Sequence, residues 1–99
     1  MAQTSDICAA IRTLRVLEFD YHGAHRVVTP YLHGVGARGA EMLRGVQIGG
    51  ESRSGGLWFG KLWIVSEIEN LRLTAQAFVP DDPNYNPNDS AMATIHCRV

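Results

Sequence analysis

The chain has 99 residues, of which 45% are hydrophobic and 19% are charged, and its net charge is −1. This length is enough for one domain, residues 1–99, and this composition is ordinary for a globular protein and excludes an intrinsically disordered chain. The near-neutral charge excludes non-specific duplex binding that is driven by the bulk charge of the protein.

The first predicted element is a helix over residues 7–14. The polar residues 4–6, Thr-Ser-Asp, are suited to cap its N-terminus. Aliphatic residues follow at positions i, i+3, i+4 and i+7, namely Ile7, Ala10, Ile11 and Leu14. They form one apolar stripe, through which the helix would pack on the rest of the domain.

The first predicted strand covers residues 16–21, where apolar and aromatic side chains alternate with acidic ones. Residues 22–24, His-Gly-Ala, supply a turn because glycine adopts positive φ at no steric cost. A second strand is expected over residues 25–32. Pro30 has no N–H for a β-ladder, so this strand lies at a sheet edge or bends there.

Two glycine-rich loops are expected over residues 34–39 and 49–56, on either side of a third strand at 40–48. In that strand Arg44 falls on the same face as three apolar residues. Either a bulge near Gly45 re-aims its side chain, or Arg44 points into a cavity.

The rest of the chain alternates between strands and turns. Residues 66–70 predict a turn or a single helical turn. Three prolines and three asparagines within residues 80–89 exclude regular structure, and Tyr85 is available to anchor this segment. Period-two patterns predict three further strands, over residues 57–65, 71–75 and 91–99.

One helix followed by about six short strands predicts a mainly β fold. Because no second helix is expected, the strands must close on themselves or form a sandwich. Short strands with frequent turns favour a small SH3-like or Sm-like barrel of about five or six strands, with one N-terminal helix. Its strands would lie within residues 16–78 and 91–99.

The order of several residues resembles a WYL domain over residues 7–78. The matching positions are Ile11, Arg15, residues 19–23 (FDYHG), residues 26–30 (RVVTP), Leu43, residues 61–71 (KLWIVSEIENL) and Phe78. The resemblance implies an Sm-type barrel of the kind that senses ligands in bacterial transcription regulators, and several such domains bind nucleic acid or nucleotides. This chain would be a stand-alone version.

Two positions differ from the family pattern. Residues 41–43, Glu-Met-Leu, stand where the family has its Trp-Tyr-Leu, and Glu67 replaces a basic residue. Both positions are linked in the family to ligand binding or its support, so the family ligand does not transfer to this chain.

The predicted function is the binding of a nucleotide or of single-stranded nucleic acid. Such sites combine cations for phosphate with aromatic faces for bases. The candidate phosphate-binding residues are Arg26, Arg44 and Lys61, and the candidate stacking residues are Tyr21, Trp58 and Trp63.

Four of these side chains also have a structural interpretation. Arg44 pairs with a carboxylate such as Glu18 or Asp20, Arg26 is a solvated cation on an edge strand, and Tyr21 and Trp63 belong to the core. The alternative function is a homo-oligomerisation or protein-interaction module that associates through strand edges.

Catalysis, metal binding and a cofactor are not expected. No nucleophile elbow, P-loop, dinucleotide fingerprint or HExxH motif is present in the sequence. Glu18 and Asp20 are interpreted as an exposed acidic stripe. His22, His25 and His33 lie close together without a second group of ligands, so they are interpreted as exposed turn histidines.

The location is expected to be cytoplasmic, with no membrane partner. No apolar run approaches the roughly 20 residues that cross a bilayer, and residues 1–8 show no secretory signal pattern. In a reducing compartment Cys8 and Cys97 would be free, buried thiols, and a disulfide between them is the alternative.

Overall fold

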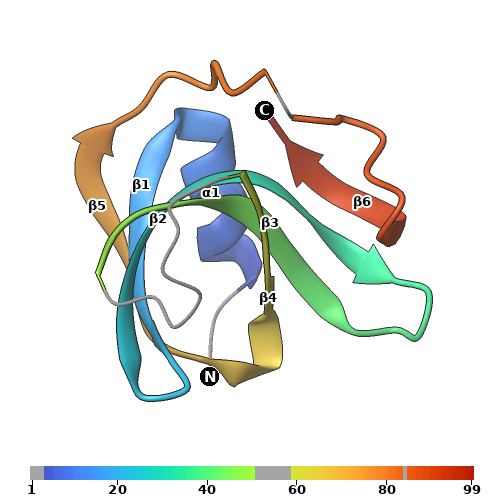
Figure 1. Cartoon of the computed structure of the whole chain (residues 1–99), viewed down its shortest axis with the longest axis horizontal. Coiled ribbons are helices and arrows are strands. Elements are labelled where there is room, and N and C mark those ends of the chain that lie inside the picture. Colours follow the sequence, from blue (N-terminus) through green and yellow to red (C-terminus); the bar gives the residue numbers. More distant parts are fainter. Residues whose placement is uncertain (1–3, 51–58, 84) are drawn as a thin grey trace.

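The computed structural model describes residues 4–50, 59–83 and 85–99 (Figure 1). Their six strands form one antiparallel sheet with the path β4-β3-β2-β1-β5, and β6 also pairs with β2. The predicted mainly β, barrel-like fold with one N-terminal helix is confirmed. The elements are α1 (Thr4–Thr13), β1 (Arg15–Tyr21), β2 (Ala24–Gly36), β3 (Glu41–Gly50), β4 (Phe59–Ile64), the 3₁₀ turn η1 (Val65–Glu67), β5 (Ile68–Ala77) and β6 (Met92–Arg98).

The core lies between α1 and the curved sheet. Helix α1 contacts β1, β2, β5 and β6, and Figure 1 shows it between β1 and β6. Each large aliphatic or aromatic side chain that is buried in this way stabilises the fold by about 1.5–3 kcal/mol. The core residues include Ile7, Ala10, Ile11, Leu17, Phe19, Val28, Leu43, Trp63, Val65 and Ile68. Among the described residues, no helix is long and apolar enough to span a bilayer.

The helix begins at Thr4, before the predicted start at residue 7, and ends at Thr13. Leu14 has a φ of 56° and terminates it, because a left-handed residue cannot continue a right-handed helix.

The first hairpin is present, but the predicted turn over residues 22–24 is wrong for Ala24, which begins β2. Tyr21 pairs with Ala24, which leaves His22 and Gly23 as a two-residue turn. Their φ values of 52° and 78° match the type I′ turn, whose twist fits that of the flanking strands.

Strand β2 continues to Gly36, so the predicted loop over residues 34–39 is wrong for its first three residues. A Cβ on Gly34 would lie 2.2 Å from the backbone oxygen of Thr94 in β6. The glycine therefore permits close approach of a neighbouring strand, which is the second common role of glycine in sheets. The second predicted loop is likewise wrong for residues 49–50, which end β3, and its other residues lie outside the described residues.

Pro30 lies on a central strand, so the predicted edge position is wrong. The β1 ladder ends at Val28 and the β6 ladder begins at Leu32. Pro30 faces the gap between these two partners, where no N–H donor is needed. The register between β2 and β3 shifts between Pro30 and Leu32. This irregularity agrees with the other predicted possibility, in which the strand bends at Pro30.

The later segments follow the prediction with adjusted bounds. The turn after β4 is limited to η1, and β5 already begins at Ile68, so the predicted turn is wrong for residues 68–70. Residues 80–83 and 85–89 have no helix or strand, as expected. Tyr85 anchors the segment, since its hydroxyl donates to the carbonyl of Val99 and its ring lies 5.3 Å from that of Tyr31.

The two cysteines form a disulfide, so the prediction of two free thiols is wrong. Cys8 lies in α1 and Cys97 in β6, with Cα atoms 5.7 Å apart. A cross-link over 89 residues of sequence separation would stabilise the fold by about 4–5 kcal/mol in the chain-entropy model. The prediction failed because it assumed a reducing compartment.

Candidate metal centre

His33 is a fully buried histidine on β2 with a defined tautomer. Its Nδ1 lies 2.8 Å from the backbone oxygen of Met42. Because a carbonyl oxygen only accepts hydrogen bonds, Nδ1 carries the proton and donates it. The other nitrogen, Nε2, therefore presents a lone pair. Nε2 is buried and has no hydrogen-bond partner in the described part of the chain.

Burial lowers the pKa of His33, because the charged imidazolium loses its hydration. The hydrogen bond to Met42 and the charge of Glu41 oppose this effect without reversing it. A group with a pKa below the usual 6.5 is neutral at pH 7. Its Nε2 lone pair is then free of a proton, which is the form that binds metals.

Glu41 opens β3 on the other side of a tight turn from β2. Its register partner on β2 is Val35, which places it close to His33. Glu41 Oε1 lies 3.7 Å from His33 Nε2 and 2.9 Å from His96 Nε2. One carboxylate oxygen thus faces two imidazoles.

His96 reaches this group because β6 contains a bulge. Cys97 pairs with His33, and Ile95 pairs with the next β2 residue, Gly34, so His96 is the extra residue on β6. A bulge re-aims a side chain that strict alternation would send elsewhere. The His96 ring consequently lies 5.2 Å from the ring of His33.

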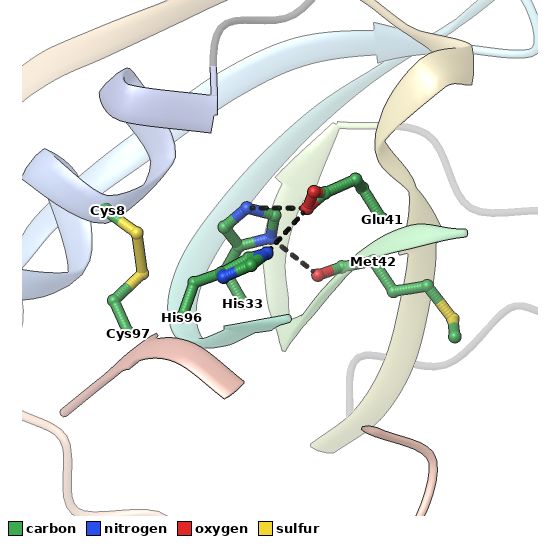
Figure 2. Close-up of a disulfide and its surroundings, with 6 residues drawn as sticks. All are labelled: Cys8, His33, Glu41, Met42, His96 and Cys97. Carbon is green, nitrogen blue, oxygen red and sulfur yellow. Dashed lines mark hydrogen bonds and ion pairs between the residues drawn. A yellow bond between two sulfur atoms is a disulfide. The ribbon is translucent and has the colours of Figure 1, made fainter. Parts of the chain in front are cut away.

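His33, Glu41 and His96 each offer one ligand atom, and these atoms lie within 4.8 Å of one another. In a tetrahedral site with bonds near 2.0–2.1 Å, ligand atoms are about 3.3 Å apart. The observed distances of 2.9 and 3.7 Å lie on either side of that value. Figure 2 shows the carboxylate of Glu41 pointing toward both rings.

The prediction of exposed turn histidines is correct only for the hairpin. His22 is exposed and pairs with Glu67. His25 is partly exposed at the start of β2 and lies 3.3 Å from Glu18. His33 is buried in the sheet, so the prediction is wrong there. His96 was not a candidate, because no local pattern connects it with a residue 63 positions earlier.

Arg26, a predicted phosphate ligand, is buried with 6% of its surface exposed, so its interpretation as a solvated edge cation is wrong. Its guanidinium donates to Gln47 Oε1 at 3.3 Å and to the Tyr21 carbonyl at 3.4 Å. Its Nε has no acceptor in the described part of the chain. Burial and the charge of Arg26 lower the pKa of Lys61, another predicted phosphate ligand.

Arg44 lies apart from them. The buried residues of β3 are Leu43, Gly45 and Gln47, so Arg44 is on the opposite face. Its Nε and Nη2 donate to the two carboxylate oxygens of Asp89 at 2.6 and 3.2 Å. The ion-pair interpretation is therefore correct, but the predicted partners Glu18 and Asp20 are wrong.

Asp89 has a pKa below its usual value. Burial raises this pKa, and the hydrogen bond from Arg44, the N–H of Ala91 and the charge of Arg44 together outweigh that effect. The bidentate pair joins the proline-rich residues 80–89 to β3. It occupies the Nε and Nη2 donors with which Arg44 would bind a phosphate.

Two of the predicted stacking residues, Trp63 and Tyr21, serve the fold. Trp63 is 2% exposed and packs edge-to-face on Phe19 at 5.6 Å, so its role as an exposed platform is wrong. Tyr21 accepts a hydrogen bond from the Ile64 N–H, and its ring stacks on His22. Trp58 lies outside the described residues.

An open pocket of about 490 Å³ lies by the first hairpin, lined by His22 and residues 66–69. None of the predicted ligand-binding residues within the described part of the chain lines it. Glu18 and Asp20 lie on the surface, where Arg72 and Asn70 bond to them. These contacts agree with the interpretation of an acidic surface stripe.

Comparison of the chain with family models, with curated proteins and with solved structures found no match. The resemblance to a WYL domain therefore stays a prediction.

Proposed function

We propose that this protein binds a divalent transition-metal ion through His33, Glu41 and His96. One observation carries the proposal: the lone pair of a buried, neutral imidazole faces a carboxylate oxygen at 3.7 Å. Both atoms are hydrogen-bond acceptors in this tautomer, so no proton lies between them; Glu41 Oε1 is hydrogen-bonded to His96 Nε2, whereas His33 Nε2 has no partner among the described residues. A cation between them would satisfy both.

The ligand set favours zinc or a neighbouring transition metal. Imidazole nitrogens suit Zn²⁺, Cu²⁺ and Ni²⁺, whereas Mg²⁺ and Ca²⁺ prefer sites made of oxygen atoms. No thiolate is available, because both cysteines are in the disulfide. Three protein ligands leave a position for water or another small base. The carbonyl of Met42 would hold the His33 ring in place, as outer-shell partners of metal-bound histidines do.

Calorimetric titration of the native, disulfide-bonded protein with Zn²⁺ tests the proposal. The decisive variant is His33→Asn, because the asparagine amide can still donate to the Met42 carbonyl but lacks Nε2. We expect wild type to bind one Zn²⁺ and this variant to lose that binding. At 100 times Kd, Zn²⁺ would stabilise wild type by about 2.7 kcal/mol.

The matched control is His22→Asn, which makes the same change at an exposed histidine and suits its positive φ. This control should bind Zn²⁺ as wild type does. Equal binding by wild type and His33→Asn, or no binding by either, contradicts the proposal.

A second candidate function is binding of a phosphate-bearing ligand, a nucleotide or single-stranded nucleic acid, as the predicted WYL resemblance implies. The buried Nε of Arg26, a donor without an acceptor among the described residues, favours it. Nucleotides and short oligonucleotides should then raise the melting temperature, less so at high salt. Absence of any shift contradicts this function.

Assembly and location stay predictions. Strands β4 and β5 end the path of the sheet, and a homo-oligomer would form by pairing of such edges. The mass of the protein in solution tests it. The disulfide argues against the predicted cytoplasmic location, because structural disulfides persist mainly in oxidising compartments. A count of free thiols in protein taken directly from cells tests the location.

A further inference from the structure

The metal ligand His96 lies on the strand with the fewest partners near the site. Strand β6 pairs with β2 and with no other described strand, and this ladder contains two register shifts. The first shift is the bulge at His96 itself. A short ladder with two interruptions holds a strand less firmly than a regular one.

The disulfide adds a covalent attachment of β6 to helix α1, on which β6 also packs. Cys97 follows His96 directly and bonds to Cys8 on α1. Helix α1 is fixed in the core by Ile7, Ala10 and Ile11, all with no exposed surface. Cys97 pairs with His33 across the β2–β6 ladder, and Figure 2 shows the disulfide on the side of the two histidines away from Glu41. The position of His96 thus depends on a covalent bond one residue away.

We propose that the Cys8–Cys97 disulfide controls the metal affinity of the His33–Glu41–His96 site, an inference that rests on the proposed function. With the disulfide intact, β6 holds His96 beside Glu41, and three ligands are in place. After reduction, β6 is held by its ladder and packing alone. Part of the free energy of metal binding must then be used to order His96, so the metal affinity falls.

The same coupling acts in reverse. A metal ion that bridges β6 to β2 and β3 opposes departure of β6, and linkage requires that it also favours the oxidised cysteines. The reduction itself is ordinary. A trialkylphosphine gives two electrons to the S–S bond and takes an oxygen from water, the two water protons pass to the sulfurs, and two thiols and a phosphine oxide result.

A double-mutant cycle with Zn²⁺ as the probe tests this inference. The four proteins are wild type, Cys8→Ser with Cys97→Ser, His96→Asn, and the triple variant. Serine replaces cysteine because the thiols of a reduced protein would themselves bind Zn²⁺. Circular dichroism first establishes that each variant is folded at the assay temperature.

We expect the double-serine variant to bind Zn²⁺ about tenfold or more weakly than wild type, an effect like that of losing a positioning group. His96→Asn should weaken binding at least as much, and the triple variant should be no weaker than His96→Asn. Equal affinity of the folded double-serine variant and wild type, or additive losses in the cycle, overturns the coupling and leaves the proposed function intact. Failure of oxidised wild type to bind Zn²⁺ overturns the proposed function itself.

A second measurement keeps the inference testable if the double-serine variant does not fold. The rate of phosphine reduction of native protein is followed with and without Zn²⁺, with His96→Asn as the control. Zn²⁺ should slow reduction of wild type and leave the control unchanged. Equal slowing of both proteins, or of neither, overturns the coupling.

Discussion

Arg26 and His33 lie on the same strand, both are buried, and each has one nitrogen without a hydrogen-bond partner among the described residues. The difference is in what each nitrogen requires. Nε of Arg26 is a donor on a permanent cation, which already donates to Gln47 and Tyr21 through other atoms. Nε2 of His33 is an acceptor that faces another acceptor. The Arg26 donor needs an anion or tolerates the lack of one, whereas the His33 acceptor needs a cation.

This comparison shows that an unpartnered buried atom is informative only when its chemistry and its neighbours are read together. A charged guanidinium with two bonds and an aromatic ring 5.9 Å away is partly compensated. A lone pair 3.7 Å from a carboxylate is not.

The largest expected effect concerns the stabilising role of Arg26. Arg26→Ala should lower the free energy of unfolding by about 2–4 kcal/mol, because it leaves a cavity and removes the bonds to Gln47 and Tyr21. Arg26→Met, which keeps the apolar stem and removes the unpartnered N–H, should cost less. Urea denaturation measures both. If Arg26→Met abolishes Zn²⁺ binding, the two buried nitrogens are not independent.

A smaller effect is expected at Asp89, whose two carboxylate oxygens accept hydrogen bonds from Nε and Nη2 of Arg44. Asp89→Asn should lower the free energy of unfolding at pH 7 by about 1–3 kcal/mol. The folded pKa of Asp89 is lowered. Its contribution is therefore complete above the unfolded pKa of about 3.9, and is lost as the pH falls through the folded value.

Urea denaturation of wild type and Asp89→Asn at pH 7 and near pH 3 checks this dependence. The difference between the two proteins should shrink at acid pH. A constant difference would show that Asp89 acts through shape and not through charge.

The smallest effect is expected at His25, which shares β2 with His33 but is partly exposed. His25→Gln should change the free energy of unfolding by about 0–1 kcal/mol, as for other surface ion pairs. Its Zn²⁺ affinity should equal that of wild type. A loss of Zn²⁺ affinity in calorimetry would place the ion nearer the hairpin than we propose.

Local chemistry made part of the fold predictable. The hairpin at His22–Gly23 and the alternation in β1 depend on neighbouring residues alone, and both are present in the structure. Gly34 and Gly36 misled the prediction, because the sequence does not reveal whether a glycine serves a turn or the approach of another strand. That distinction depends on β6, about sixty residues away.

The candidate site was predictable only in part, for the same reason. His33 and Glu41 are close in sequence, but strict alternation says nothing of the bulge that brings His96 to them. The unusual position of Arg44 was visible in the pattern of β3, whereas its partner Asp89 lies 45 residues further along. Contacts between distant segments depend on register, which a single sequence leaves undetermined.

The cross-link between positions 8 and 97 also determines how this chain would respond to mechanical force. Tension applied at its two ends would pass through the first residues, the sulfur–sulfur bond and the last two residues, and would bypass all of the sheet except the end of β6. The roughly 90 enclosed residues, about 300 Å of contour at ~3.3–3.6 Å per residue, would extend only after that bond is broken.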